Sequence, residues 1–320
     1  MKYVQIESMR HSYPISTMCR FLGVSESGFH AWRTRPMSAR AAEEKRLEVH
    51  IKAAHQRTRE TCGPERLQAE LADNGVEVGV HRIKRIRRKL GLRCKQKRKF
   101  KVTTDSKHSL PIAPHLLERQ FAVTAPNKAW VTDITYISTD EGWLYLAGVK
   151  DLFNGELVGY AMSERMTKSL VQQALFRAVS KKRPPPGLMH HSDRGSQYCS
   201  HDYRKMLRQF GMTASMSRKG DCWDNAPMES FRGTLKNELV HHRKYFTREQ
   251  ARSEITEYTE IFYNRMRKQK RLGYFSPAAF TQKILCKSIS SLTRWTPRLP
   301  TDLSRGDLQI YGIFFARQHT

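Results

Sequence analysis

The sequence has few cysteines and lacks any long apolar segment. Its six cysteines are scattered over 320 residues, and no two lie close enough together to form a zinc knuckle. A signal peptide and an apolar run long enough to span a membrane are both missing. These absences predict a cytoplasmic protein with reduced thiols, no membrane partner and no zinc. Any metal that it binds should therefore have oxygen ligands.

Acidic residues are also scarce relative to basic ones. The chain has 57 lysines and arginines against 30 aspartates and glutamates, a formal net charge of +27. Such an excess indicates a polyanionic partner, and nucleic acid is the first candidate. A ribosomal protein or a merely solubilising surface charge is the alternative, and the acidic motifs described below argue against it.

Residues 11–35 have the pattern of two short helices joined by a glycine turn. The first helix has an apolar stripe, Gly23 supplies the turn, and Ser25 or Ser27 can cap the second helix. This is the spacing of a helix-turn-helix, which places its second helix in the major groove of DNA. An ordinary helical hairpin is the alternative. We assign this module to residues 1–40.

Residues 41–95 predict a second helical module. A charged amphipathic helix ends near Gly63 and Pro64, and two further helices follow. The last of them alternates buried isoleucines with six cations over eight residues, which fits a helix lying along phosphates. A solvated basic face without a specific partner is the alternative. The cations that we expect to contact DNA are Arg82, Arg85 and Lys89.

Composition divides the rest of the chain into three parts. Residues 96–124 are basic, polar and bounded by prolines, which indicates a linker that lies on DNA. Residues 125–285 form the largest predicted domain, and residues 286–320 are a tail to which the sequence assigns no fold. The large domain opens with three predicted strands, and Asn154-Gly155 between the last two is a hairpin signal.

Three acidic residues of the large domain stand in unusual surroundings. Asp133 interrupts an apolar, β-branched strand, and Asp193 stands where a short apolar run meets a glycine turn. Glu229 falls in the first turns of a helix whose start is marked by Asp224, Asn225 and Pro227. Burying an unpaired carboxylate is unfavourable, so a strand aspartate needs a partner or a function. A hydrogen-bonded structural aspartate and a solvated helical glutamate are the alternatives.

The sequence motifs around these three acids resemble those of a known family. WVTDIT with Asp133, HSDRGSQY with Asp193 and DNAPMESFRGTLKNEL with Glu229 resemble the DDE catalytic core of transposases and retroviral integrases. The second and third acids are separated by 35 residues, the spacing typical of that family. More closely, residues 1 to about 281 resemble the second-frame protein of an insertion sequence 3 family transposase.

The resemblance implies a fold and a site. We expect an α/β ribonuclease H-like core, a mixed sheet with three antiparallel strands first, preceded by all-α helix-turn-helix modules. Asp133 is expected to bridge two Mg²⁺ ions, with Mn²⁺ as a possible substitute, while Asp193 and Glu229 each hold one. The side chains expected to contact DNA near these acids are Lys236, whose alternative is a plain surface lysine, Asn225 and Trp223.

The resemblance also implies an activity. We expect a DNA transposase that cleaves donor DNA at terminal inverted repeats and transfers the strand by attack of a 3′-OH on a phosphodiester. Its expected partners are double-stranded DNA of the element ends and target, further copies of itself on DNA, and the first-frame product of the same element. It should act in the bacterial cytoplasm, at the nucleoid. The alternatives are a ribonuclease H-like nuclease without strand transfer and a non-catalytic DNA-binding regulator.

Overall fold

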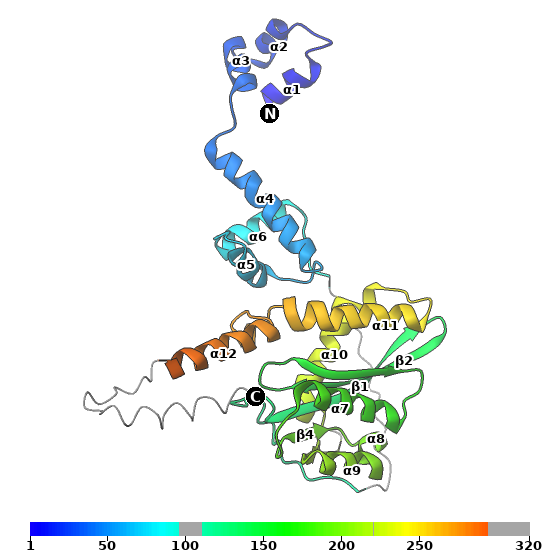
Figure 1. The fold of residues 1–320 in the computed structure, drawn as a ribbon. Helices are drawn as coiled ribbons and strands as arrows, with labels where there is room; N and C mark the ends of the chain where they lie inside the picture. Colours follow the sequence, from blue (N-terminus) through cyan, green and yellow to red (C-terminus); the bar gives the residue numbers. More distant parts are fainter. Residues whose placement is uncertain (96–110, 220, 294–320) are drawn as a thin grey trace, which may run out of the picture. The chain divides into compact units, whose positions relative to one another are not determined.

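The chain forms two compact units (Figure 1). The computed structural model describes residues 1–95, 111–219 and 221–293. One unit is Met1–Lys95 and the other is Gln96–Thr320. Most of the predicted tail lies outside the described residues. No helix in the described part is long and apolar enough to cross a membrane.

The first unit begins with three short helices around a small core. They are α1 (Lys2–Met9), α2 (Ile15–Leu22) and α3 (Glu26–Thr34). The predicted glycine turn is present, because Gly23 ends α2 with a left-handed φ of 60°. The Ser25 hydroxyl caps α3 by accepting from the amide of Gly28. The sequence did not predict α1, although its Ile6 enters the same core as Cys19 and Phe29.

Three more helices complete the first unit. A long helix, α4 (Ala39–Arg57), packs with α5 (Pro64–Asp73) and α6 (Val80–Lys89). Proline is favoured at the first position of α5, because the amide hydrogen that it lacks would have no partner within the helix there and its fixed φ suits the helix. The second core of this unit has eight buried members: Leu47, Ile51, Ala54, Cys62, Leu67, Leu71, Ile83 and Ile86.

A mixed five-stranded sheet forms the centre of the second unit. Its strands are β1 (Ala129–Thr139), β2 (Gly142–Asp151), β3 (Leu157–Ser163), β4 (Met189–Ser192) and β5 (Thr213–Met216), in the order β3-β2-β1-β4-β5. The first three strands pair antiparallel, whereas β4 is parallel to β1 and β5 is parallel to β4. This arrangement confirms the predicted ribonuclease H-like core.

Helices cover both faces of this sheet. One cluster combines the sheet with α7 (Lys168–Lys182), α8 (Ser196–Cys199) and α9 (His201–Gln209). The other combines it with α10 (Ala226–Glu238) and α11 (Arg248–Glu257). Trp130 enters the first cluster and Val131 the second, because successive strand residues point to opposite faces.

The remaining elements follow or flank α10. They are η1 (Cys222–Asn225), η2 (Val240–His242), a wide π-helical turn η3 (Tyr258–Met266), η4 (Lys270–Leu272) and α12 (Pro277–Thr293). The last helix continues beyond residue 285, where we placed the end of the domain.

The predicted linker is shorter than expected. Residues 111–124 belong to the second unit, because Leu117 is buried in the α10 cluster and Phe121 and Val123 pack against it. The amides of Leu116 and Leu117 both donate to the Ser215 hydroxyl on β5. Apolar side chains thus hold this part of the basic segment on the core. The rest of the predicted linker, residues 96–110, lies outside the described residues.

Candidate active site

The parallel pairing of β1 and β4 aligns two of the predicted acids. Val131 pairs with His191 in this register. Continued by two residues along each strand, the register brings Asp133 level with Asp193, which follows the last residue of β4. Asp133 therefore lies beyond the end of the shorter strand, where the edge of β1 is open. Parallel strands commonly place functional groups at such carboxyl ends.

Hydrogen bonds fasten the beginning of α10 to the same part of the sheet. The side-chain amide of Asn225 donates to the carbonyl oxygen of Thr132, the residue before Asp133, at 3.0 Å. The buried ammonium of Lys150 on β2 donates to the carbonyl oxygen of Pro227 at 2.8 Å. These two contacts tie both neighbouring strands to the first turn of the helix. Glu229 is carried in that turn.

An arginine that the sequence did not single out contacts two of the three acids. Arg232 lies one turn after Glu229 on α10. Its guanidinium is 2.9 Å from Oδ2 of Asp133 and 3.4 Å from Oε1 of Glu229. The other oxygen of Asp133 accepts from the amide of Ile134 at 2.7 Å. The strand acid and the helix acid therefore meet at one guanidinium.

The electrostatics of Asp133 reflect this crowding. The residue is 6% exposed, and burial is the main reason that its pKa is raised to about 7. The carboxylates of Asp193 and Glu229 raise this pKa further, whereas the Arg232 guanidinium lowers it. Like charges at one site disfavour ionisation, and a nearby cation restores it. The two other predicted acids thus act on Asp133, whose ionised form is favoured by a nearby cation.

The oxygen chemistry of the site fits a divalent metal, but the ligands are not gathered. Among residues 1–95, 111–219 and 221–293, no group of three or more Asp, Glu, His or Cys side chains is arranged to hold an ion. The reason is local: Arg232 engages Asp133 and Glu229, and one oxygen of Asp193 accepts from the amide of Gly195 at 2.9 Å. Carboxylate oxygens are the ligands that Mg²⁺ and Mn²⁺ prefer.

The three side chains predicted to contact DNA near the acids have different surroundings. Trp223 is 67% exposed and available to a partner. Lys236 is partly buried, and its ammonium lies 4.5 Å from the centre of the Tyr136 ring. Asn225 is 4% exposed and bonded to β1, so in this arrangement it positions the helix and does not reach the surface.

Asp224 plays a part that sequence reasoning missed. The sequence marked it only as part of the helix start, whereas its carboxylate accepts from the guanidinium groups of Arg119 and Arg218 and from the amide of Arg218. These hydrogen bonds hold its pKa far below the ordinary value, although the side chain is fully buried. The charge thus anchors the loop before α10. A buried aspartate in a run of polar residues gives no distinct sequence signal.

On α6, the three cations predicted to contact DNA are paired within the first unit. Arg82, Arg85 and Lys89 face the acidic side of α4 at distances of 2.6–2.8 Å. Their partners are Glu43, Glu44 and Glu48 respectively. The cations are spaced by three and four residues, so all three lie on one side of α6 and can reach the acidic residues of α4 in a ladder of ion pairs.

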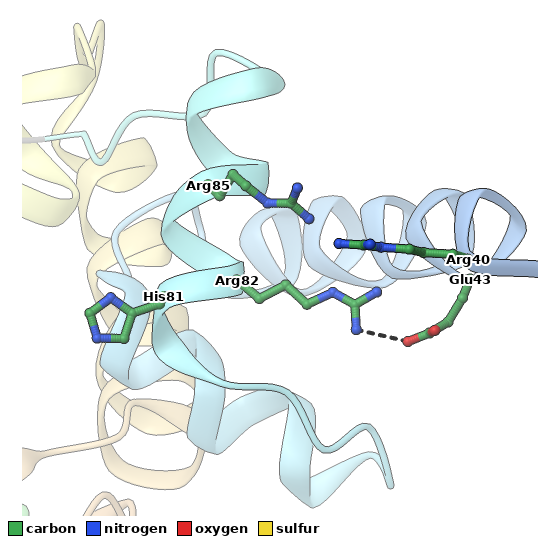
Figure 2. A pocket seen from close by; sticks show the side chains of 5 residues that line it. All are labelled: Arg40, Glu43, His81, Arg82 and Arg85. Atoms are coloured by element: carbon green, nitrogen blue, oxygen red, sulfur yellow. Dashed lines mark hydrogen bonds and ion pairs between the residues drawn. The ribbon is translucent and has the colours of Figure 1, made fainter.

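A pocket of about 520 Å³ lies at one end of this ladder. Figure 2 shows Arg82 and Arg85 extending from α6 toward Arg40 and Glu43 of α4, while His81 points to the other side of α6. Lys84 and Arg88 of the same helix are also exposed, and no ion pair joins either of them to a described residue. The helix therefore carries three cations paired with α4 and two that have no ion pair with a described residue.

Three protein-family matches cover parts of the chain. Residues 42–100 match the family described as HTH-like domain, and residues 123–222 match the one described as Integrase core domain. A further description as Integrase core domain matches residues 229–285. The first match covers α4, α5 and α6, and the other two contain Asp133, Asp193 and Glu229.

Full-length relatives are similar over most of the chain. An insertion element IS600 protein of 31 kDa from Shigella sonnei is 59% identical over 266 residues, 83% of this chain and 98% of the relative. The transposase InsF of insertion sequence IS3A from Escherichia coli K12 is 41% identical over 288 residues, 89% of this chain and 100% of the relative.

Solved structures with a similar fold are more distant. A simian T-cell lymphotropic virus intasome chain is 17% identical with a TM-score of 0.43, covering 80% of this chain and 77% of that chain. The catalytic core of HTLV-2 integrase is 16% identical with a TM-score of 0.38, covering 48% of this chain and 96% of that chain.

Proposed function

The chain belongs to the IS3 family of transposases, and on this premise we propose that Asp133, Asp193 and Glu229 are its catalytic, metal-binding residues. A chain with this integrase core is a DDE polynucleotidyl transferase and acts in DNA transposition. We infer that it cleaves donor DNA at the terminal inverted repeats of its own element. The freed 3′-OH then attacks a phosphodiester of the target.

One observation carries the site assignment. The register of β1 and β4 aligns Asp133 with Asp193, and the Asn225 and Lys150 hydrogen bonds bring the first turn of α10 to the same strand edge. Arg232 contacts both Asp133 and Glu229, and Asp193 follows β4 level with Asp133, which supports a shared site for the three acids. Neighbouring carboxylates disfavour each other's ionisation, so this grouping supports a role in binding cations.

Bound Mg²⁺, or Mn²⁺ in its place, would neutralise charge on the attacking and leaving oxygens of the phosphodiester. In this chain, Asp133 would share two ions, and Asp193 and Glu229 would each hold one. Lys236 lies two turns after Glu229 on α10, and its ammonium is over the Tyr136 ring. It contacts the DNA backbone as a point charge. Exposed Trp223 contacts DNA at the loop before α10.

DNA binding by the first unit depends on its basic faces. We infer that the exposed Lys84 and Arg88 of α6, which form no ion pair with a described residue, contact phosphates first. Arg82, Arg85 and Lys89 contribute when phosphates replace their glutamate partners. Two element ends must be joined at once, so we infer that several copies act together on DNA. The first-frame product of the element is a further proposed partner.

The test uses the full chain, Mg²⁺ and labelled duplex DNA that carries an element end. Wild type should give a metal-dependent nick at the end and longer joined products on a denaturing gel. Asp193→Asn should give neither. Nicking without joined products would indicate a nuclease, and binding without cleavage would indicate a regulator or a need for the first-frame product.

A further inference from the structure

Arg232 is an unusual residue for the centre of an acidic site. It lies three residues after Glu229, so both side chains leave the same side of α10. Its two terminal nitrogens contact Oδ2 of Asp133 at 2.9 Å and Oε1 of Glu229 at 3.4 Å. The guanidinium thus holds the oxygens that the proposed function requires for metal ions.

Burial explains why a cation stands at this point. Asp133 is 6% exposed, and an ionised carboxylate at that depth needs a partner. Lys236 is the other cation on this part of α10, but its ammonium lies over the Tyr136 ring. Arg232 is therefore the side chain that compensates Asp133 in the described arrangement.

We propose that Arg232 is a resident counter-ion of the acidic site: it pairs with Asp133 and Glu229 in the metal-free protein and leaves both when divalent ions bind. This inference rests on the proposed function, because it takes these acids as the metal ligands. Guanidinium and metal compete for the same oxygens, so each weakens the binding of the other.

The geometry gives Arg232 a way out of the site. Its side chain is 23% exposed, so the guanidinium can turn to solvent without crossing the core. Lys236 lies four residues further along α10, on the same side of the helix. A displaced Arg232 lies beside Lys236, where both cations face the DNA backbone. Metal loading thereby turns an internal ion pair into a second phosphate contact.

The first experiment measures Mn²⁺ binding to the full chain at pH 8.5 from the loss of the paramagnetic resonance signal of free Mn²⁺. Arg232→Gln should bind roughly ten-fold more tightly than wild type, within the usual range of coupling between two sites. Arg232→Lys keeps the cation and should stay close to wild type. Asp193→Asn should lose the binding, which marks the ions that belong to this site.

The outcomes separate the two proposals. If Asp193→Asn abolishes binding but Arg232→Gln binds Mn²⁺ no more tightly than wild type, the counter-ion inference is overturned and the metal site stands. If Asp193→Asn binds as wild type does, the ions lie elsewhere, and both the metal site and the inference fail.

A second measurement does not depend on the fold of the glutamine variant. In wild type, the Nε–H resonance of Arg232, assigned by its loss in Arg232→Lys, should shift when Mg²⁺ is added, because its carboxylate partners are taken. A resonance that stays unchanged at Mg²⁺ concentrations that saturate the site would contradict the proposal.

Discussion

Two regions of the molecule pair their functional charges internally, but at different depths. On α6, Arg85 and Lys89 keep more than half of their side-chain surface exposed while they pair with α4. At the proposed active site, Asp133 is almost fully buried and pairs with Arg232. Exposed pairs contribute about 0–1 kcal/mol each and exchange partners easily. A buried carboxylate that loses its cation needs another one in its place. We therefore expect Asp133 to exchange Arg232 only for another cation, whereas the exposed α6 cations can leave their glutamates for phosphates at little cost.

The largest expected effect comes from replacing Glu229, the acid on α10. Glu229→Gln removes a proposed metal ligand without removing a phosphate contact. We expect strand cleavage to fall by at least about 1,000-fold, in the range found when a group that acts only in the transition state is lost. DNA affinity, measured by fluorescence anisotropy, should change by less than about two-fold, because the contacts between basic side chains and phosphates are untouched. Cleavage at the wild-type rate would exclude Glu229 from the site.

The free energy of unfolding can be used to compare a buried ion pair with an exposed one within the second unit. Glu238 accepts from Arg267, and both side chains are 9% exposed. Glu238→Ala leaves the arginine buried and unpaired, so we expect a loss of about 3–5 kcal/mol in the free energy of unfolding by urea. The matched control is Glu249→Ala, which breaks the exposed pair with Arg252 and should cost less than about 1 kcal/mol. Equal losses would contradict the comparison.

Releasing the α6 cations should strengthen DNA binding. The double variant Glu43→Gln, Glu48→Gln removes the partner of Arg82 and the nearer partner of Lys89, which keeps only the longer contact of 3.7 Å with Glu44. We expect affinity for duplex DNA at about 0.1 M salt to rise by about ten-fold, together with a steeper salt dependence.

A control is needed because the change in net charge alone favours DNA. Glu26→Gln, Glu77→Gln changes the charge equally at two exposed acids of the same unit that lie off the ladder. If this control variant gains as much affinity as the ladder variant, the α6 pairs do not restrain DNA binding.

The smallest expected effect concerns a buried neutral group. Burial lowers the pKa of His190 to about 3, and its Nε2 is 3.1 Å from the Tyr203 hydroxyl. Between that pKa and about 6.5 the unfolded chain takes up a proton that the folded chain does not, so stability falls as the pH drops below about 6.5.

His190→Gln can still hydrogen-bond but cannot be protonated. From pH 6.5 to 5.5 the variant should lose about 1 kcal/mol less than wild type in the free energy of unfolding. Urea titrations at the two pH values measure this difference. If the free energy of unfolding changes with pH equally in the variant and in wild type, the pKa of His190 does not differ between the folded and unfolded chains.

Much of the fold was readable from local patterns. The glycine turn at Gly23, proline at the start of α5 and the β-branched runs of β1, β2 and β3 each act within a few residues. The order and flanking words of Asp133, Asp193 and Glu229 are equally local. A short helix such as α1 was missed because its stability comes from packing Ile6 on distant residues, not from its own sequence.

What the sequence determined by itself is therefore most of the elements and the family, and it predicts the three acids of the site. Only the tertiary structure decided which charged side chains form ion pairs with one another. Arg232 reaches Asp133 across 99 positions, Asp224 takes Arg119 as its partner, and the α6 cations find glutamates about 40 residues away. The physical reason is that ion pairing depends on distance and burial, which periodicity along the chain does not encode.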